Sequence, residues 1–442
     1  MKIEQIYTGC LAQGAYYIES DGEVAIIDPL REVQQYIDKA QASNSTIKYI
    51  FETHFHADFV SGHLTLSQKT GAPIIYGPTA EPNFKAHIAT DGETFKIGKL
   101  TIIALHTPGH TMESTTYLLR DENGKDHAIF SGDTLFLGDV GRPDLAQKAA
   151  SMTQEQLAAT LFHSLRTKIM PLADDVIVYP AHGAGSACGK NLSKETVGTL
   201  GEQKRTNYAL RADMTETEFV AEVTDGLLPP PIYFPENVRL NKNGYEAIDI
   251  IIEKNKAFTP AEFKQAADEA LILDVRDADS FGKVHIPGAI FIGIDGGFAP
   301  WVGSLITDIN QPIILVTPEG REQETITRLA RVGYDNTLGY LAGGMQIWVD
   351  AGLETASIGR ITANELETLM NNGEDSVIDV RKPGEYSSAH IANVPNLPLD
   401  FINDHVADFP PQKTTYLHCA GGYRSMIAAS ILKARGFHNM ID

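Results

Sequence analysis

Four short segments of the sequence combine histidine or aspartate with glycine or proline directly after an apolar run. The first is Thr53–Phe59, which reads THFHADF and is followed by Ser61, Gly62 and His63, and the others contain His110, Asp133 and His182. Imidazole nitrogens and carboxylate oxygens are ligands that proteins offer to zinc and iron. One His-x-His can be an accidental surface feature, but four such segments in order indicate a metal site built from strand-end loops.

A second kind of chemistry is indicated by a cysteine that precedes a glycine-rich turn and an arginine. Cys419, Gly421, Gly422 and Arg424 fit the spacing CxxGxR ahead of an expected helix. The glycines let several backbone N–H groups point at one sulfur, and the helix N-terminus and the guanidinium add positive potential. These effects favour a thiolate and would stabilise a persulfide on Cys419.

The region around this cysteine occurs twice. Leu273–Arg276 is matched by Ile378–Arg381, and further matches follow in the same order. Each copy alternates strands and helices, which predicts a small parallel α/β unit. Thr317 stands where the second copy has Cys419, and a hydroxyl cannot carry a sulfane sulfur. We therefore expect the first copy to lack the chemistry of Cys419.

Two further expectations concern these copies. The acidic and basic residues of each matched segment should pair structurally, Asp274 with Arg276 and Asp379 with Arg381. The first copy ends with Leu341–Trp348, whereas the second stops before its counterpart of that ending. We therefore expect the C-terminus to be clipped.

The chain has 442 residues, enough for about three domains. We expect the first over residues 1–245, and the two repeated copies over 257–353 and 358–442. Strand-like runs in the first region lead into the loops with histidine and aspartate. Its prolines predict that Leu227–Pro235 is an extended closing arm, because proline cannot continue a helix.

Composition excludes several classes of function. With 57 acidic and 36 basic residues the formal charge is −21, which argues against nucleic-acid binding and against docking on an anionic membrane. No run reaches the ~20 apolar residues of a membrane helix, and the N-terminus has no signal-like stretch. Three widely spaced cysteines do not make a disulfide framework. We expect a cytoplasmic protein with reduced thiols.

The metal-type segments resemble those of the metallo-β-lactamase superfamily across residues 1–245. The resemblance implies an αββα sandwich in that region, followed by two parallel-sheet α/β domains. Hydrolytic members such as glyoxalase II bind two metals through the motif HxHxDH. Phe59 stands where this motif has its last histidine. A phenyl ring cannot coordinate a metal, so a two-metal hydrolase is disfavoured.

Within the superfamily the sequence looks most similar to the persulfide dioxygenases, notably at Gly141–Asp144. This resemblance implies one Fe²⁺ per chain, held by His54, His110 and Asp133. A two-histidine, one-carboxylate triad leaves open positions for O₂ and a persulfide sulfur. The residues that the resemblance places around these ligands are His56, Asp58 and His182.

Asp58 and Arg142 have both a functional and a structural interpretation. A ligand histidine is oriented by the group that accepts its other N–H, and Asp58 is our candidate for that group; alternatively it caps a helix. Arg142 lies where the family contacts its thiol substrate, and an arginine can bind a carboxylate or phosphate with two hydrogen bonds. Alternatively, Arg142 pairs with Asp144 and braces the loop.

Cys188 and Lys190, which follow His182 in the sequence, are two further candidate site residues. Cys188 precedes an expected helix, and its pKa would be lowered there, making it reactive; a buried, inert cysteine is the equal alternative. Lys190, with the glycine-rich backbone around it, could hold an anion. Cys10 is interpreted as a packing residue.

The two repeated copies resemble rhodanese-like domains, with Cys419 and Arg424 as catalytic residues and Gly421 and Gly422 in the sulfur-binding loop. The combined resemblance implies oxidation of a low-molecular-weight thiol persulfide by O₂ to thiol and sulfite, and formation of thiosulfate through Cys419. The expected partners are that persulfide, O₂, sulfite and thiosulfate, and a second copy of the chain. Two alternatives stay open: a glyoxalase-II-like zinc thioesterase, and a sulfur carrier without turnover.

Overall fold

The computed structural model describes residues 1–374 and 376–442, and the chain divides into two compact units. The first unit comprises residues 1–247 and 331–333, and the second comprises residues 248–330 and 334–442. Among the described residues, no helix is long and apolar enough to cross a membrane.

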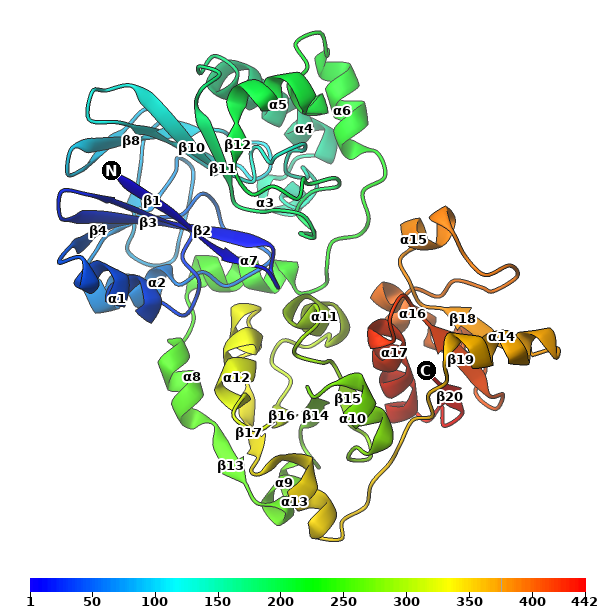
Figure 1. Cartoon of the computed structure of the whole chain (residues 1–442). Coiled ribbons are helices and arrows are strands. Elements are labelled where there is room, and N and C mark those ends of the chain that lie inside the picture. The colour runs from blue at the N-terminus through cyan, green and yellow to red at the C-terminus, as the bar shows by residue number, and fades with distance from the viewer. Residues whose placement is uncertain (375) are drawn as a thin grey trace. The chain divides into compact units, whose positions relative to one another are not determined.

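Two six-stranded sheets form the centre of the first unit (Figure 1). The first sheet has the order β1-β2-β3-β4-β5-β6, with strands β1 (Lys2–Thr8), β2 (Gln13–Ser20), β3 (Glu23–Ile27), β4 (Thr46–Phe51), β5 (Ile74–Tyr76) and β6 (His87–Ile88). The second has the order β12-β11-β10-β9-β8-β7, with strands β7 (Thr94–Ile97), β8 (Leu100–His106), β9 (Thr115–Arg120), β10 (Asp126–Gly132), β11 (Ile177–Pro180) and β12 (Gly198–Thr199).

The sheets pack face to face because alternate side chains of each strand share one side. Tyr16 and Ile18 of β2 belong to the cluster between the sheets, together with Tyr117 of β9 and Phe130 of β10. Tyr17, between them in sequence, belongs instead to the cluster on the outer side of the first sheet.

Helices cover both outer faces. Tyr36 and Leu66, from α1 and α2, pack on the first sheet, while Leu161 and Phe219, from α4 and α6, pack on the second. The helices of this unit are α1 (Gln34–Ala42), α2 (His63–Thr70), α3 (Gln147–Ala150), α4 (Gln154–Ser164), its π-helical extension Leu165–Ile169, α5 (Leu200–Thr206), α6 (Glu216–Thr224) and α7 (Phe234–Asn243). The αββα sandwich expected from the sequence is confirmed.

The predicted closing arm is shorter than Leu227–Pro235. Helix α7 begins at Phe234, so Pro235 lies in its first turn. Proline is well tolerated there because its missing N–H would have no partner within the helix, and its fixed φ suits the helical conformation. The expectation treated Pro235 as a helix breaker, whereas here it starts a helix.

The second unit contains two parallel sheets, as the repeated α/β pattern predicted (Figure 1). One has the order β13-β17-β16-β14-β15, with strands β13 (Lys256–Phe258), β14 (Leu271–Asp274), β15 (Ile290–Phe291), β16 (Ile313–Val316) and β17 (Thr337–Leu341). The other has the order β18-β19-β20, with strands β18 (Val377–Asp379), β19 (Thr415–His418) and β20 (Met440–Ile441). The helices of this unit are α8 (Ile248–Lys254), α9 (Pro260–Ala266), α10 (Ala278–Lys283), α11 (Phe298–Leu305), α12 (Glu322–Arg331), α13 (Gly344–Asp350), α14 (Ala363–Asn371), α15 (Pro383–Ser388), α16 (Ile402–His405) and α17 (Tyr423–Ala434).

The two structural Asp–Arg pairs are confirmed. Asp274 and Asp379 are fully buried, and each accepts hydrogen bonds from the backbone and the guanidinium of the arginine two residues later. The shortest guanidinium bond is 2.6 Å for Arg276 and 2.7 Å for Arg381. Each pair fixes the loop that follows the first central strand of its copy.

Replacing Asp379 with alanine should lower the free energy of unfolding of the second copy by about 2–4 kcal/mol, because several donors of Arg381 lose a buried acceptor. Urea unfolding of the full chain, followed by a probe in this copy, measures the change. Asp408→Ala, which removes an exposed carboxylate paired with His405, is the control. Equal effects of the two substitutions would contradict the structural role of Asp379.

Candidate metal centre and sulfur-transfer loop

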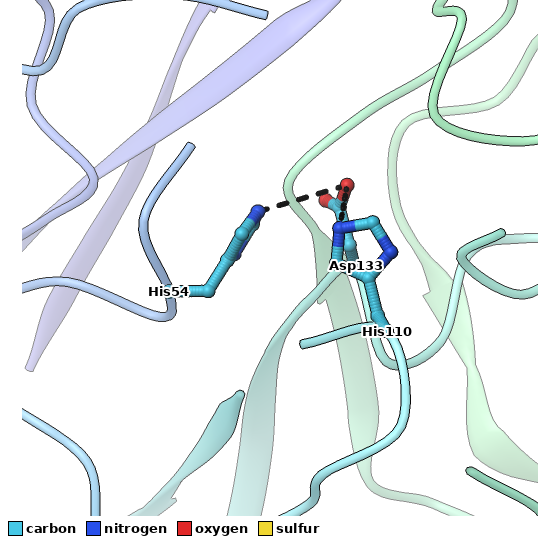
Figure 2. Close-up of side chains that lie close together, drawn as sticks. All are labelled: His54, His110 and Asp133. Carbon is cyan, nitrogen blue, oxygen red and sulfur yellow. Dashed lines mark ion pairs between the residues drawn. The ribbon is translucent and has the colours of Figure 1, made fainter. Parts of the chain in front are cut away.

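The predicted ligands come together at the ends of strands from both sheets. His54 follows β4, His110 follows β8 and Asp133 follows β10. Figure 2 shows the two imidazoles directed toward the Asp133 carboxylate. Their Nε2 atoms lie 3.8 Å and 3.4 Å from Asp133 Oδ2. All three side chains are buried, and they can offer one donor atom each to a single ion.

Hydrogen bonds on the far side of each imidazole leave Nε2 facing the carboxylate. Thr53 Oγ1 donates to Asp28 at 2.8 Å, so its oxygen can accept from His54 Nδ1 at 3.0 Å. His110 Nδ1 is 2.9 Å from the carbonyl oxygen of Arg142, which can only accept. Protons on both Nδ1 atoms free the Nε2 lone pairs for a metal.

His182, which follows β11, lies on the other side of Asp133. Its Nε2 is 3.5 Å from Asp133 Oδ1 and 3.5 Å from Asp58 Oδ2, while its Nδ1 donates to the carbonyl of Ala12 at 3.2 Å. Asp58, His182 and His56 can also each offer one donor atom to a common point. Asp133 therefore lies between two groups of possible ligands.

His56 is held by two acidic residues that sequence reasoning missed. Its Nε2 is 3.1 Å from Asp28 and 3.6 Å from Glu52. Burial alone would lower the pKa of His56, but Asp28 and then Glu52 outweigh burial and raise this pKa to about 9. The Phe59 ring packs against the His56 ring at 4.5 Å between centroids, with the two planes tilted by 40°. A signal for Asp28 and Glu52 existed, because each is a carboxylate at the end of an apolar strand.

Unpartnered buried atoms show that these residues fit a metal. Both oxygens of Asp58 and of Asp133, and Nε2 of His182, are buried without a hydrogen-bond partner among the described residues. Burial raises the pKa of Asp58 and lowers that of His54 well below its usual value. Unsatisfied buried carboxylates are costly, and a bound cation would remove that cost. A neutral His54 is also the form that binds a metal.

Gly141 is required by the close packing of this site. A Cβ at this position would overlap the backbone oxygen of Asp133 and crowd His110 Nδ1. Its own N–H donates to that Asp133 oxygen at 2.9 Å. The glycine therefore lets the following loop run across two ligands, which puts the Arg142 carbonyl in place to orient His110.

Asp58 and Arg142 make contacts that differ from those expected of their functional roles. The orienting role expected of Asp58 falls to Thr53 and to the Arg142 carbonyl, since Asp58 faces His182 instead. The Arg142 guanidinium is buried and makes two bonds of 2.7 Å with Asp144, besides bonds to backbone carbonyls. That is the bracing pair named as its alternative, and substrate binding by Arg142 stays a prediction.

Cys188 is close to the site but is not in the predicted setting. No helix follows it, because residues 189–197 form turns and α5 begins at Leu200. Burial, followed by the charges of Asp133 and Asp58, raises the pKa of Cys188 well above its usual value. The expected lowering is therefore wrong in this structure. Cys188, Asp133 and His182 nevertheless could each direct one donor atom to a common ion.

The other two candidates in this unit have ordinary surroundings. Lys190 Nζ donates to the carbonyl oxygens of Glu222 and Asp225, at 2.5 Å and 3.0 Å, so anion binding by its side chain stays a prediction. Cys10 is partly buried.

In the second copy of the repeat, the expected loop surrounds Cys419. The Gly422 N–H donates to Cys419 Sγ at 3.2 Å, and Ser425 Oγ lies 3.4 Å from the sulfur. Burial opposes the thiolate, but the Ser425 and glycine bonds, including those of Gly421, prevail and lower the pKa of Cys419. Gly422 adopts a positive φ of 82° where α17 begins.

Arg424 is held by a residue that the sequence did not indicate. Its guanidinium makes two bonds to the Glu385 carboxylate, at 2.5 Å and 2.8 Å. In the first copy, Thr317 is buried at the place of the cysteine, and Arg321 bonds Asp295 at 2.7 Å.

Comparisons with known proteins match the metal-site region and the repeated region of the chain to two different families. The metallo-β-lactamase superfamily model matches residues 8–182, and the rhodanese-like domain model matches residues 259–351 and 362–442. A probable hydroxyacylglutathione hydrolase of Schizosaccharomyces pombe is 29% identical over 51% of this chain and 90% of its own. The human mitochondrial persulfide dioxygenase is 28% identical over 47% of this chain and 74% of its own.

A solved structure from Staphylococcus aureus, described as a metallo-beta-lactamase, extends further along the chain. It is 30% identical, covers 77% of this chain and 99% of its own, and has a TM-score of 0.68. With the buried histidine–aspartate site between two sheets and the cysteine loop in the second unit, these matches establish that the chain belongs to the metallo-β-lactamase superfamily and carries two rhodanese-like domains after its metallo-β-lactamase domain.

Proposed function

We propose that this protein is a persulfide dioxygenase with a sulfur-transfer domain. It oxidises a low-molecular-weight thiol persulfide, RSSH, with O₂ and water to RSH and sulfite. It then converts sulfite to thiosulfate through a sulfane sulfur carried on Cys419. The observation that carries the proposal is the triad of His54, His110 and Asp133, in which two Nε2 atoms and one carboxylate meet in a buried site.

The donor set supports iron at this triad. Fe²⁺ bound by two histidines and a carboxylate would supply O₂ activation with positions left for substrate, whereas zinc is redox-inert. The chain's own contribution is orientation: Thr53 and the Arg142 carbonyl fix both imidazoles. Phe59 supports a single-ion centre, because its ring stands where the two-metal motif has its last histidine and cannot coordinate a metal.

The sulfur-transfer step needs only residues of the Cys419 loop. The Cys419 thiolate first attacks the outer sulfur of a second RSSH, and the S–S bond of that persulfide breaks to release RSH. Sulfite then attacks the outer sulfur of the Cys419 persulfide, the new S–S bond breaks, and its electron pair returns to Cys419 Sγ while thiosulfate leaves. The Gly422 N–H and Ser425 beside Sγ support this step, because they stabilise the thiolate that is released.

A zinc thioesterase of the glyoxalase II type is the second candidate. Two observations favour it: the second donor group of His56, Asp58 and His182, and the hydroxyacylglutathione hydrolases among the relatives. In that case Asp133 would bridge two zinc ions. The metal content separates the two proposals.

Protein purified under nitrogen should contain about one iron per chain, and His110→Ala or Asp133→Ala should lose it, because three ligands leave little redundancy. Elemental analysis measures iron and zinc together. His163→Ala, which alters an exposed histidine, should keep the iron. Two zinc ions per chain, with thioester hydrolysis that depends on them, would contradict the proposal.

Cys419→Ser should abolish sulfur transfer from thiosulfate to cyanide, since oxygen cannot replace the sulfur that carries the persulfide. Thr317→Ala should leave the rate within about 2-fold of wild type, because a buried hydroxyl far less nucleophilic than a thiolate does no chemistry there. Thiocyanate formation measures both. Loss of transfer in a folded Thr317→Ala protein would show that the first copy is not inactive.

A further inference from the structure

Tyr423, the residue between the glycine and the arginine of the cysteine loop, reaches into the inactive copy. Its hydroxyl donates to the backbone oxygen of Gly293 at 2.7 Å. Its ring lies against Phe291 of β15, with 6.0 Å between centroids. The same helix makes a second bond to the first copy, where Ser430 Oγ accepts from the Phe291 N–H at 3.0 Å. Both copies belong to one compact unit.

Residues Gly293–Gly296 form a turn shaped to receive this ring. A Cβ at Gly296 would overlap the Tyr423 ring, and a Cβ at Gly293 would come within 3.2 Å of it. The Gly296 N–H also bonds the Gly293 oxygen at 3.3 Å, closing the turn. Only glycine at position 296 leaves room for the tyrosine ring, and a side chain at position 293 would make a tight contact with it.

Arginines of the inactive copy brace this turn. Arg321, the last residue of the loop that lacks a cysteine, binds Asp295 at 2.7 Å. Arg328 of α12 donates to the Ile294 oxygen at 2.7 Å. The arginine that matches Arg424 in the repeat therefore no longer faces a sulfur and instead holds the turn beneath Tyr423.

Two consecutive residues of the cysteine loop, Tyr423 and Arg424, are thus held by different partners. Arg424 is bound by Glu385 of its own copy, and Tyr423 is bound by the turn of the other copy. Gly422, whose N–H bonds Cys419 Sγ, directly precedes both. A displacement of Tyr423 must move this N–H relative to the sulfur.

We propose that the inactive rhodanese copy is a structural part of the sulfur-transfer site, in which the Gly293–Gly296 turn holds Tyr423 as a positioning residue for the Cys419 loop. The proposal rests on the sulfur-transfer role given to Cys419 above. It assigns the first copy a task that needs no cysteine of its own, and it gives Arg321 a bracing role at the turn.

Two substitutions in the full chain test this role. Tyr423→Phe removes only the hydroxyl, and Gly296→Ala forces the ring out of its place. The controls are Tyr416→Phe, whose hydroxyl has no hydrogen bond among the described residues, and Gly384→Ala, where a Cβ has open space. All variants are also made with Cys188→Ser, and a protein with Cys188→Ser alone is the reference. Alkylation is then limited to Cys419 and the partly buried Cys10, and analysis of the labelled peptides separates these two.

The readout is the rate of Cys419 alkylation by iodoacetamide as a function of pH. Alkylation follows the thiolate, so loss of an N–H bond to sulfur should move the inflection to higher pH. The charged residues around the sulfur are the same in all variants. They are Arg424 with Glu385, His418 near Asp379, and Asp442 bonded to Ser425. At neutral pH we expect a decrease of roughly 5-fold for Tyr423→Phe, the effect of one hydrogen bond, and more for Gly296→Ala.

Unchanged alkylation profiles in both test variants, with unchanged thermal stability, would overturn the proposal. A shift in the controls as large as in the test variants would also overturn it, because the effect would then be general. The alkylation profile needs no turnover, so it tests positioning even if wild-type Cys419 transfers no sulfur. Absence of transfer with a shifted profile would contradict the proposed function but not this inference.

Discussion

A carboxylate buried without a hydrogen-bond partner among the described residues, that of Asp133, is the feature on which the first domain depends. Placing such a group away from water is unfavourable unless a positive charge compensates for it. The sandwich supplies the place, since strands of both sheets end around Asp133, and His54 and His110 turn their free nitrogens toward it. Buried polar atoms without hydrogen-bond partners therefore lie at the point where a cation would bind.

The orientation of the ligands comes from groups outside the triad of His54, His110 and Asp133. Asp28 directs Thr53, which directs His54, while Gly141 permits the loop whose carbonyl directs His110. These contacts link β3, β4 and β8 to one site. At Phe59, where the motif of two-metal hydrolases has its last histidine, an aromatic ring packs on His56 instead.

Much of this could be predicted from the sequence, because His54, His110 and Asp133 each follow an apolar strand, and strand ends gather at one edge. The Arg142–Asp144 pair is one of the two interpretations of Arg142, because the two residues share one loop. The partner of Asp58 could not be predicted, since it depends on which loops meet after folding. The lowered pKa considered for Cys188 depended on a helix that does not form, and burial beside two carboxylates raises this pKa instead. The role of Tyr423 is visible only when both copies of the repeat are folded together.

The measurement that tests the central claim most directly is oxygen uptake with a thiol persulfide, followed by separation of sulfite from thiosulfate, in wild-type protein and in Cys419→Ser. The account predicts about one O₂ consumed for each persulfide oxidised. Thiosulfate should accumulate in wild type, and sulfite should replace it in the variant while uptake persists. No oxygen uptake by the iron-loaded protein, or thiosulfate yields in the variant equal to wild type where sulfite and persulfide do not combine unaided, would contradict it.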